Sequence, residues 1–294
     1  MSFADEVREE LCELPVKKNC CRAALTAGLL LGADLRAGKE IAVRYRHETV
    51  ATMASSTIRQ QYGKAPDSVM TGACGRRYYD LSFVSPAAYK LLRQMQAEDA
   101  DATHTLRFSC DACQAAFLRG AFLTLGTVND PHKSFHLEFL FPNEERVSFF
   151  ERFLDSVGYP ARRIKRQNGV GVYVKDGASV EDLVGMMGAQ RTVFEIINSR
   201  IERDIRNNEN RATNCVAKNI EKTISAATRQ IEAINRLMET GRMDSLPEPL
   251  RQTAMLRYRN PDATLDELVA LHEPSISKSG LNHRLKKLLD EAED

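Results

Sequence analysis

LTAGLLLGAD (Leu25–Asp34) and LRGAFLTLGT (Leu118–Thr127) are two apolar segments, rich in small residues, that decide the fold of this chain. Each carries a glycine a few residues from its start. These glycines, Gly28 and Gly120, are 92 positions apart in the sequence. The segments are long enough and apolar enough to be buried, and their similarity suggests that they occupy equivalent places in two halves of one domain.

The stretches that follow the two segments keep nearly the same offset. Strand-like runs begin at Ile41 and Ser134, 93 positions apart, and alternating runs begin at Tyr78 and Val170, 92 apart. Each half reads as helix, hairpin, helix, hairpin, helix, which is an α+β pattern rather than βαβ winding. We therefore predict an internally duplicated α+β domain. Its predicted limits are 1–205, with repeats at about 15–100 and 108–192.

The dipeptide Asn168-Gly169 predicts the turn of a hairpin in the second half. Both residue types adopt the positive φ angles of a type I′ turn at low cost. The basic run before it would then be a strand, in which alternate side chains share a face, so only part of its charge can lie on one surface. Its basic residues are a candidate secondary DNA contact: Arg162, Arg163, Lys165 and Arg166.

The sequence from about Val193 to Thr240 lacks proline and has a helical period. Two interpretations are open: a helical connector over 206–244, or an ordinary amphipathic helix packed on the α+β domain. One face is marked by apolar residues at spacings of three and four: Ile220, Ile224, Ala227, Ile231, Ile234 and Met238.

Three short helices are expected in the last segment, 245–294. Thr264 and Glu267 have the spacing of a capping box ahead of the second helix. Ser277 is a natural N-cap for the third helix. Two helices joined by a short turn, the second of them basic, are typical of a helix-turn-helix, here from about Thr264 to Glu291.

The third helix separates an apolar stripe from a polar face. The stripe predicted to pack inward consists of Leu281, Leu285, Leu288 and Leu289. On the other face, Ser, Asn and His side chains can hydrogen-bond base edges, while Lys and Arg engage phosphates. The candidate DNA-binding residues of this region are Ser277, Lys278, Ser279, Asn282, His283, Arg284, Lys286 and Lys287.

The composition of the 294 residues, 43% hydrophobic and 28% charged, is ordinary for a soluble folded protein. The formal net charge is only +1, so a nucleic-acid partner must be argued from local patches. The N-terminal sequence lacks the pattern of a signal peptide, and no apolar run approaches the roughly 18 residues of a membrane span. We expect a cytoplasmic, nucleoid-associated protein without a membrane partner, with its seven cysteines reduced.

Cys110-Asp111-Ala112-Cys113 raises the question of zinc, with Cys20, Cys21 and Cys74 as further ligands. A structural zinc site usually shows two such pairs, or one pair with histidines at ligand spacing. The sequence shows only one pair, so we expect buried free thiols, no metal site and no cofactor.

The two apolar segments resemble the paired core helices of LAGLIDADG homing endonucleases. In that family the two helices pack through small residues, and each ends in a metal-binding carboxylate. In this sequence Ala33 and Leu125 stand where those acids are expected, and Asp34 falls one position late. The resemblance implies a nuclease scaffold without catalytic residues, hence not an enzyme. The alternative is an active LAGLIDADG-type DNA endonuclease.

A degenerate LAGLIDADG scaffold joined to a helix-turn-helix is similar to the WhiA family of Gram-positive DNA-binding regulators. The more specific segments are NENRATNCVAKNIEKTISAATRQIEAI and PSISKSGLNHRLKKL. The resemblance implies a sequence-specific transcription regulator of double-stranded DNA, involved in cell division, chromosome segregation or sporulation. For some relatives it also implies a second regulator as partner, a WhiB-type iron–sulfur protein. A protein-binding scaffold is a further alternative.

Overall fold

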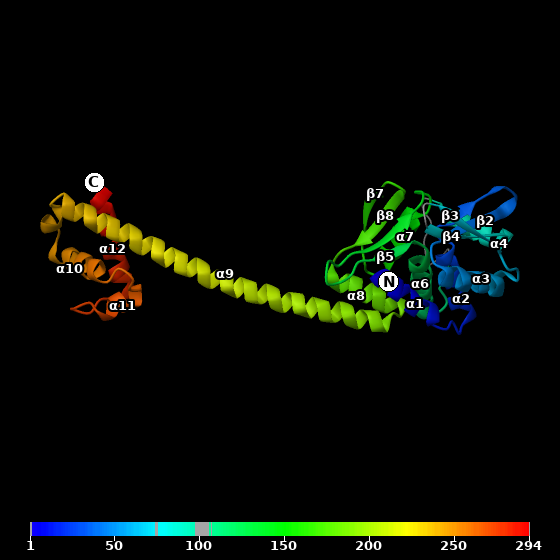
Figure 1. Cartoon of the computed structure of the whole chain (residues 1–294), viewed down its shortest axis with the longest axis horizontal. Coiled ribbons are helices and arrows are strands. Elements are labelled where there is room, and N and C mark those ends of the chain that lie inside the picture. The colour runs from blue at the N-terminus through cyan, green and yellow to red at the C-terminus, as the bar shows by residue number, and fades with distance from the viewer. Residues whose placement is uncertain (1, 74–75, 98–105, 107, 294) are drawn as a thin grey trace. The chain divides into compact units, whose positions relative to one another are not determined.

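The computed structural model describes residues 2–73, 76–97, 106 and 108–293. The chain divides into two compact units, with the division between Arg203 and Asp204 (Figure 1). The first unit is α+β and the second is helical. In the described part of the chain, no helix combines the length and the hydrophobicity that a membrane span needs.

The first unit opens with helix α1 (Phe3–Glu13), and its first repeat follows. The elements of that repeat are α2 (Asn19–Leu29), β1 (Asp34–Leu35), the 3-10 turn η1 (Ala37–Lys39), β2 (Glu40–Tyr45), α3 (Glu48–Tyr62), β3 (Asp67–Ala73), β4 (Arg76–Val84) and α4 (Pro86–Gln94). The four strands form one antiparallel sheet in the order β1-β2-β4-β3.

The second repeat has the same order of elements. They are α6 (Ala112–Leu125), β5 (Gly126–Val128), β6 (Leu137–Phe141), α7 (Val147–Ser156), β7 (Arg162–Arg166), β8 (Gly169–Val174) and α8 (Gly177–Met187). Its antiparallel sheet has the equivalent order β5-β6-β8-β7. The predicted duplication, and the pattern of helix, hairpin, helix, hairpin, helix, are confirmed.

Helices α2 and α6 pack against each other at the centre of the first unit. Residues 24–31 and residues 116–123 are buried without exception, as expected for helices that are apolar all round. Phe117 of α6 also reaches the aromatic side chains of α7, with its ring centroid 4.7 Å from that of Phe153. The paired helices therefore join the two repeats into one core.

The hairpin of β7 and β8 is present, but its predicted turn is wrong by one residue. Arg166 pairs with Gly169, so the turn consists of Gln167 and Asn168. Neither has a positive φ, which a type I′ turn would require. Gly169 instead begins β8 with a φ of 139°, and a Cβ there would lie 2.9 Å from the carbonyl carbon of Phe141. The positive φ of Gly169 and its packing against β6 both require a glycine here.

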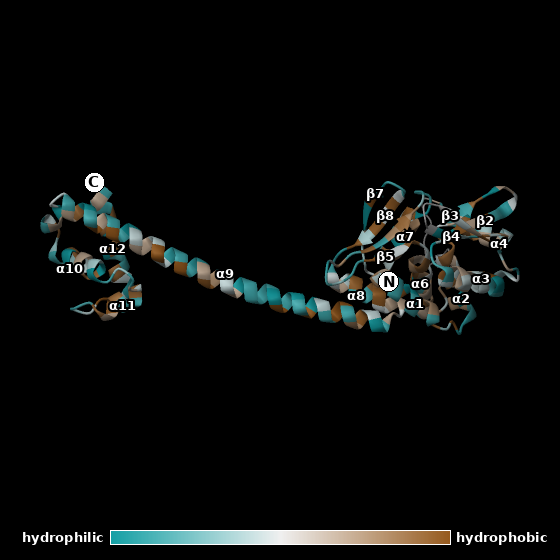
Figure 2. Ribbon diagram, viewed as in Figure 1, coloured by the Kyte–Doolittle hydropathy of each residue, from teal (hydrophilic) through white to brown (hydrophobic). Residues whose placement is uncertain are grey.

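Helix α9 (Gln190–Glu239) is continuous over 50 residues. It begins in the first unit, where Ile196 is buried, and ends in the second, where Ile234 and Leu237 are buried. Figure 2 shows mainly hydrophilic residues along its middle. Of the predicted apolar face, Ala227 and Ile234 are buried, whereas Ile220 and Ile224 are 54% and 61% exposed.

The second unit continues with short helical elements around one small core. They are η2 (Arg242–Ser245), α10 (Glu248–Arg259), α11 (Leu265–Ala270) and α12 (Lys278–Glu293). Residues 206–244 of the expected connector thus lie in α9, η2 and the residues between them.

Candidate nucleic-acid interface

Helices α11 and α12 begin where the sequence predicts. The Oγ1 of Thr264 accepts from the amide of Glu267 at 3.3 Å, and the Glu267 carboxylate accepts from the Thr264 amide at 2.8 Å. This bond from the Thr264 amide lowers the pKa of the Glu267 carboxyl. The Oγ of Ser277 accepts from the amide of Gly280 at 3.1 Å. Both predicted caps are confirmed.

The inward stripe of α12 consists of leucines packed on the other helices of the second unit. Leu281, Leu285 and Leu288 are buried in the same cluster as Leu250 of α10, whereas Leu289, also predicted to pack inward, is half-buried and is not part of this cluster. Because these leucines fix the rotation of α12, they also decide which side chains face solvent.

Five polar side chains of α12 lie opposite the buried leucines. These residues, all exposed, are Ser279, Asn282, His283, Lys286 and Lys287. We call them the exposed face of α12. Within the part of the chain that the structure describes, none of their side chains is engaged in a hydrogen bond or an ion pair. They are therefore available to a ligand without breaking an internal contact.

Two other candidate residues of this helix already make contacts within the protein. The Nζ of Lys278 lies 2.7 Å from a carboxylate oxygen of Asp266. Arg284 is half-buried and donates to the Pro249 carbonyl at 3.4 Å and to Nε2 of His272 at 3.3 Å. Since an arginine can only donate, Nε2 is the acceptor nitrogen of His272 and Nδ1 donates to the Pro274 carbonyl, 3.1 Å away. Arg284 thus helps to hold α12 in place.

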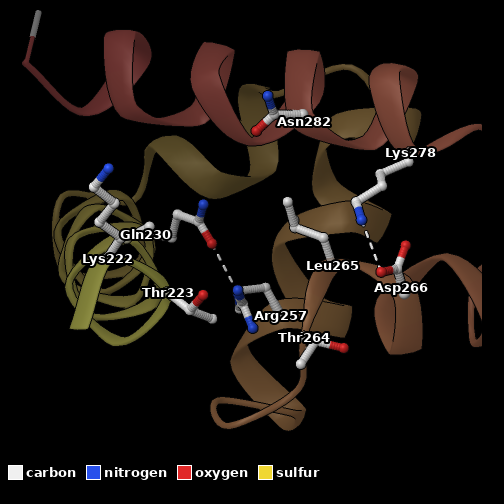
Figure 3. A pocket seen from close by; sticks show the side chains of 10 residues that line it. Lys222, Thr223, Gln230, Arg257, Thr264, Leu265, Asp266, Lys278 and Asn282 are labelled. Atoms are coloured by element: carbon white, nitrogen blue, oxygen red, sulfur yellow. Dashed lines mark hydrogen bonds and ion pairs between the residues drawn. The ribbon is translucent and has the colours of Figure 1, made fainter. Parts of the chain in front are cut away.

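A pocket of about 430 Å³ lies beside the start of α12, within the second unit (Figure 3). Lys278, Asn282 and the buried Arg257 are among the residues that line it. The Nε of Arg257 donates to Oε1 of Gln230 at 2.8 Å, and its Nη1 donates to the Ala263 carbonyl at 2.6 Å. Sequence reasoning missed Arg257, because a buried arginine in an amphipathic helix has the pattern of a surface one.

A groove of about 660 Å³ lies between the two sheets of the first unit, beside the ends of α2 and α6. Leu125 and Asp34 line it, while Ala33 is fully buried. The other carboxylate in its lining, Asp80, is held by Arg44 at 2.6 and 2.9 Å. That hydrogen bonding to Arg44 lowers the pKa of Asp80. The residues lining the groove therefore include no facing pair of free carboxylates at the two helix ends.

The buried Arg146 occupies the end of α2 in the same region. Its guanidinium donates to the carbonyl oxygens of Leu31, at 2.7 Å, and of Ala33. A cation satisfies carbonyls at the negative end of a helix dipole. A second positive charge, such as a divalent metal, would be repelled at that place.

The basic strand β7 divides its charges between the two faces of the sheet. Arg163 donates to Glu151 of α7 at 2.6 Å, while Arg166 donates to Glu138 of β6 at 2.8 and 2.6 Å. This division agrees with the alternation expected in a strand. Arg162 and Lys165 are exposed, and neither has an ion pair in the described ranges.

The described cysteines are free thiols, as expected, but four of them lie close together. The structure places Cys20 and Cys21 of α2 beside Cys110 and Cys113, so Cys110 and Cys113 have a second pair of cysteines next to them. Cys20 and Cys21 do not have the usual spacing of a ligand pair, because they are adjacent in the sequence, and they lie in the other repeat. Cys74 lies outside the described residues.

The fold defines a helix-turn-helix protein built on a duplicated LAGLIDADG-like unit without the paired acids. Two family models match: the WhiA LAGLIDADG-like domain over residues 114–206 and the WhiA C-terminal HTH domain over residues 210–292. The chain is 34% identical over 307 residues to the probable cell division protein WhiA of Ruminiclostridium cellulolyticum, covering 100% of this chain and 97% of that relative. The protein belongs to the WhiA family.

Solved structures agree with this assignment at the level of the fold. Full-length DUF199/WhiA from Thermatoga maritima superimposes with a TM-score of 0.60 at 23% identity, covering 100% of this chain and 98% of that one. A structure of the N-terminal LAGLIDADG domain of DUF199/WhiA gives a TM-score of 0.50 at 18% identity, covering 64% and 92%. The predicted fold class is confirmed.

Proposed function

We propose that this protein is a sequence-specific transcription regulator that binds double-stranded DNA in the cytoplasm through α12. The observation that carries the proposal is the exposed face of α12, held outward by three buried leucines. A helix of this kind, preceded by a short helix and a turn, fits the major groove of DNA.

The residues of α12 have different roles in this proposal. Asn282 and His283 hydrogen-bond base edges, and Lys286 and Lys287 engage phosphates. Ser277 and Ser279 lie at the helix N-terminus, where backbone amides can donate hydrogen bonds to a phosphate. Lys278 can contact DNA only if its ion pair with Asp266 breaks. Arg284 does not contact DNA in this proposal but holds α12 through its hydrogen bond to His272.

We further propose that the regulated process is cell division, with chromosome segregation or sporulation as related processes. The support is that the relatives covering the whole chain are named probable cell division proteins. Genome-wide footprinting of the purified protein tests this directly. We expect protection at a limited set of promoters that includes division genes, whereas even protection along the chromosome would contradict sequence-specific regulation.

We propose that the protein is not a nuclease. Ala33 is buried where the resemblance places one metal-binding acid, Leu125 replaces the other, and Arg146 brings a positive charge to the end of α2. Two-metal cleavage of a phosphodiester needs carboxylates that hold Mg²⁺. Incubation of the protein with Mg²⁺ and supercoiled plasmid carrying a bound promoter should leave the plasmid intact. Specific nicking that Asp34→Asn abolishes would establish the endonuclease alternative.

The first unit supports a weaker, secondary DNA contact through β7. Of its four basic residues, Arg163 and Arg166 are neutralised by glutamates, which leaves Arg162 and Lys165 as the free charges, on opposite faces of the strand. Substituting Arg162 by Ala should therefore weaken DNA binding less than substituting a lysine of α12.

A protein partner, such as another transcription regulator, is the second candidate for function. The observation that favours it is an exposed apolar run on α9 at a spacing of four residues: Val216, Ile220 and Ile224. Co-purification from a lysate with the full chain, compared with the variant Ile220→Glu/Ile224→Glu, tests it. A partner that binds equally to the wild type and the variant would exclude this apolar run of α9 as its binding site.

A further inference from the structure

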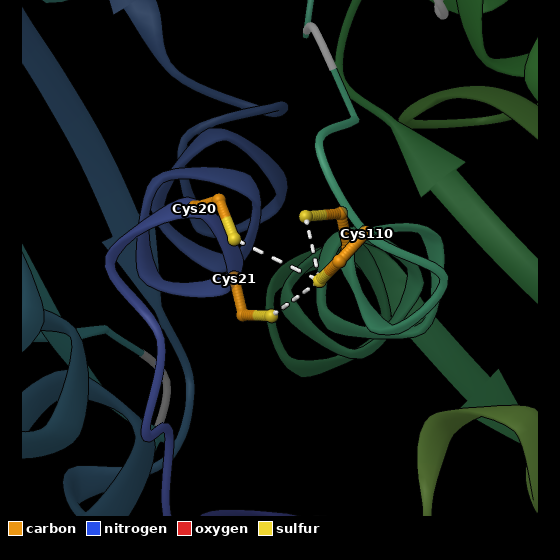
Figure 4. Close-up of side chains that lie close together, drawn as sticks. Cys20, Cys21 and Cys110 are labelled. Atoms are coloured by element: carbon orange, nitrogen blue, oxygen red, sulfur yellow. Dashed lines mark hydrogen bonds between the residues drawn. The ribbon is translucent and has the colours of Figure 1, made fainter.

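Four cysteine side chains from the two repeats converge where α2 and α6 begin. Cys20 and Cys21 lie in the first turn of α2, Cys113 lies in the first turn of α6, and Cys110 precedes α6. All four Sγ atoms lie within 4.8 Å of one another. The Sγ of Cys110 is 3.7 Å from that of Cys20, 3.5 Å from that of Cys21 and 3.6 Å from that of Cys113 (Figure 4).

The three separations from Cys110 match those of thiolates around one tetrahedral ion. With zinc–sulfur bonds of about 2.3 Å, a regular tetrahedron places its sulfurs about 3.8 Å apart. A disulfide needs about 2.05 Å, and all described cysteines are free thiols. An iron–sulfur cluster fills the space between its thiolates and would hold them farther apart than they are here.

The duplication explains how the ligands meet. Cys21 and Cys113 are separated by 92 positions, the same offset as Gly28 and Gly120, so they occupy equivalent places in the two repeats. The packing of α2 on α6 therefore brings them together. Cys20 and Cys110, which are not equivalent, complete the set of four.

The surroundings favour negative charge at this cluster. The positive ends of α2 and α6 both lie at the thiols, and helix N-termini stabilise thiolates. The side chain of Arg119, only 8% exposed, interacts electrostatically with Cys21, and its Nε has no hydrogen-bond partner among the described residues. A buried cation of this kind offsets the net negative charge of a tetrathiolate centre.

We propose that these four cysteines bind one Zn²⁺ ion in a structural site that ties the two LAGLIDADG-like repeats together. Four protein ligands leave no open position on a tetrahedral ion, so the site is structural rather than catalytic. Cys20 and Cys110 are half-buried, which gives the ion a path to the site from solvent.

Metal analysis of the untagged full-length protein, purified without chelators, tests the proposal. We expect about one zinc per chain, and a loss of at least about nine-tenths of it in Cys110→Ser and Cys113→Ser. Cys215→Ser is the matched control, because Cys215 is an exposed cysteine of α9 outside the cluster, and it should keep the full zinc content. Protein without zinc, protein with iron and inorganic sulfide, or a disulfide among these cysteines in the native protein would overturn the proposal.

A second measurement uses only the wild-type protein, so its outcome does not depend on whether the cysteine variants fold. Alkylation mapped by mass spectrometry should leave Cys20 and Cys110 protected until a strong chelator is added, while Cys215 reacts before and after. The chelated protein should have a lower Tm, restored by Zn²⁺ and not by Mg²⁺. Equal alkylation of Cys20 and Cys110 with and without chelator, together with an unchanged Tm, would contradict a bound ion.

Discussion

Gly28 and Gly120 face each other across the contact between α2 and α6. A Cβ on Gly28 would lie 2.7 Å from the amide nitrogen of Ala121, and one on Gly120 would lie 2.8 Å from the amide nitrogen of Leu29. Both neighbours are backbone atoms of the opposite helix, so no change of rotamer can relieve either overlap. The absence of side chains at these two positions therefore sets how closely the two repeats approach.

Bulk at either glycine should destabilise the first unit. Extra methyl groups in a well-packed interface cost about 1 to 3 kcal/mol, so Gly28→Val and Gly120→Val should each lower the Tm measured by calorimetry. Because both changes act on one contact, the double variant should depart from the sum of the single variants by more than about 0.5 kcal/mol. The exposed control Lys175→Val should melt like wild type. Wild-type melting of both single variants would exclude the close helix pair.

Removal of the buried guanidinium of Arg146 should also destabilise the fold. Arg146→Met leaves the carbonyl of Leu31 without this donor, and an unsatisfied buried polar group costs about 1 to 3 kcal/mol. Denaturant unfolding measures this loss. Arg162→Met is the control, since Arg162 is exposed and has no ion pair in the described part of the chain. Equal stability of the two variants would show that Arg146 does not support the end of α2.

The pair of Glu138 and Arg166 should make stability depend on acidic pH. Hydrogen bonds from Arg166 hold the pKa of the Glu138 carboxyl below its ordinary value of 4.5. A carboxyl with a depressed pKa in the folded state stabilises the fold above its unfolded pKa, and this stabilisation is lost as the pH falls through the folded pKa. Glu138→Gln should therefore be less stable than wild type at pH 7, with a difference in Tm that narrows below about pH 4.

The control for this prediction is Glu195→Gln, which changes an exposed glutamate of α9 and should leave the pH profile of Tm unchanged. A difference in Tm between Glu138→Gln and wild type that stays constant from pH 7 to pH 3 would mean that ionisation of the Glu138 carboxyl does not stabilise the fold.

The features that the sequence predicts correctly depend on residues close together in the chain or on a constant offset. The caps at Thr264 and Ser277 and the leucine spacing of α12 are local signals, so they indicate the helix and its rotation. The duplication follows from the offset of 92 between equivalent residues.

The features that the sequence does not predict depend on contacts between distant segments. Cys21 meets Cys110 only because α2 packs on α6, and the close contact of Gly169 with Phe141 exists only because β6 lies beside it. Arg146 and Arg284 have the pattern of surface residues until their acceptors on other elements are known. Each case is a tertiary contact that no local spacing encodes.

The lysines of α12 should contribute affinity without specificity. Lys286→Ala and Lys287→Ala should weaken binding to all duplexes alike and reduce the slope of log K against log salt by about one unit per lost phosphate contact. Fluorescence anisotropy over a range of salt concentrations measures both effects. Lys90→Ala, which changes an exposed lysine of α4, should keep the wild-type slope. An unchanged slope for both α12 variants would place these lysines off the DNA.

The most direct test of sequence-specific binding through α12 compares Asn282→Ala and His283→Ala in the full chain on two duplexes of equal length, a footprinted site and its scrambled sequence. Removal of a side chain that hydrogen-bonds a base edge should weaken the binding free energy for the footprinted site by about 1 to 3 kcal/mol. The loss for the scrambled duplex should be far smaller. We predict this difference for at least one of the two variants. Losses of equal size on both duplexes, for both variants, would contradict base recognition by α12.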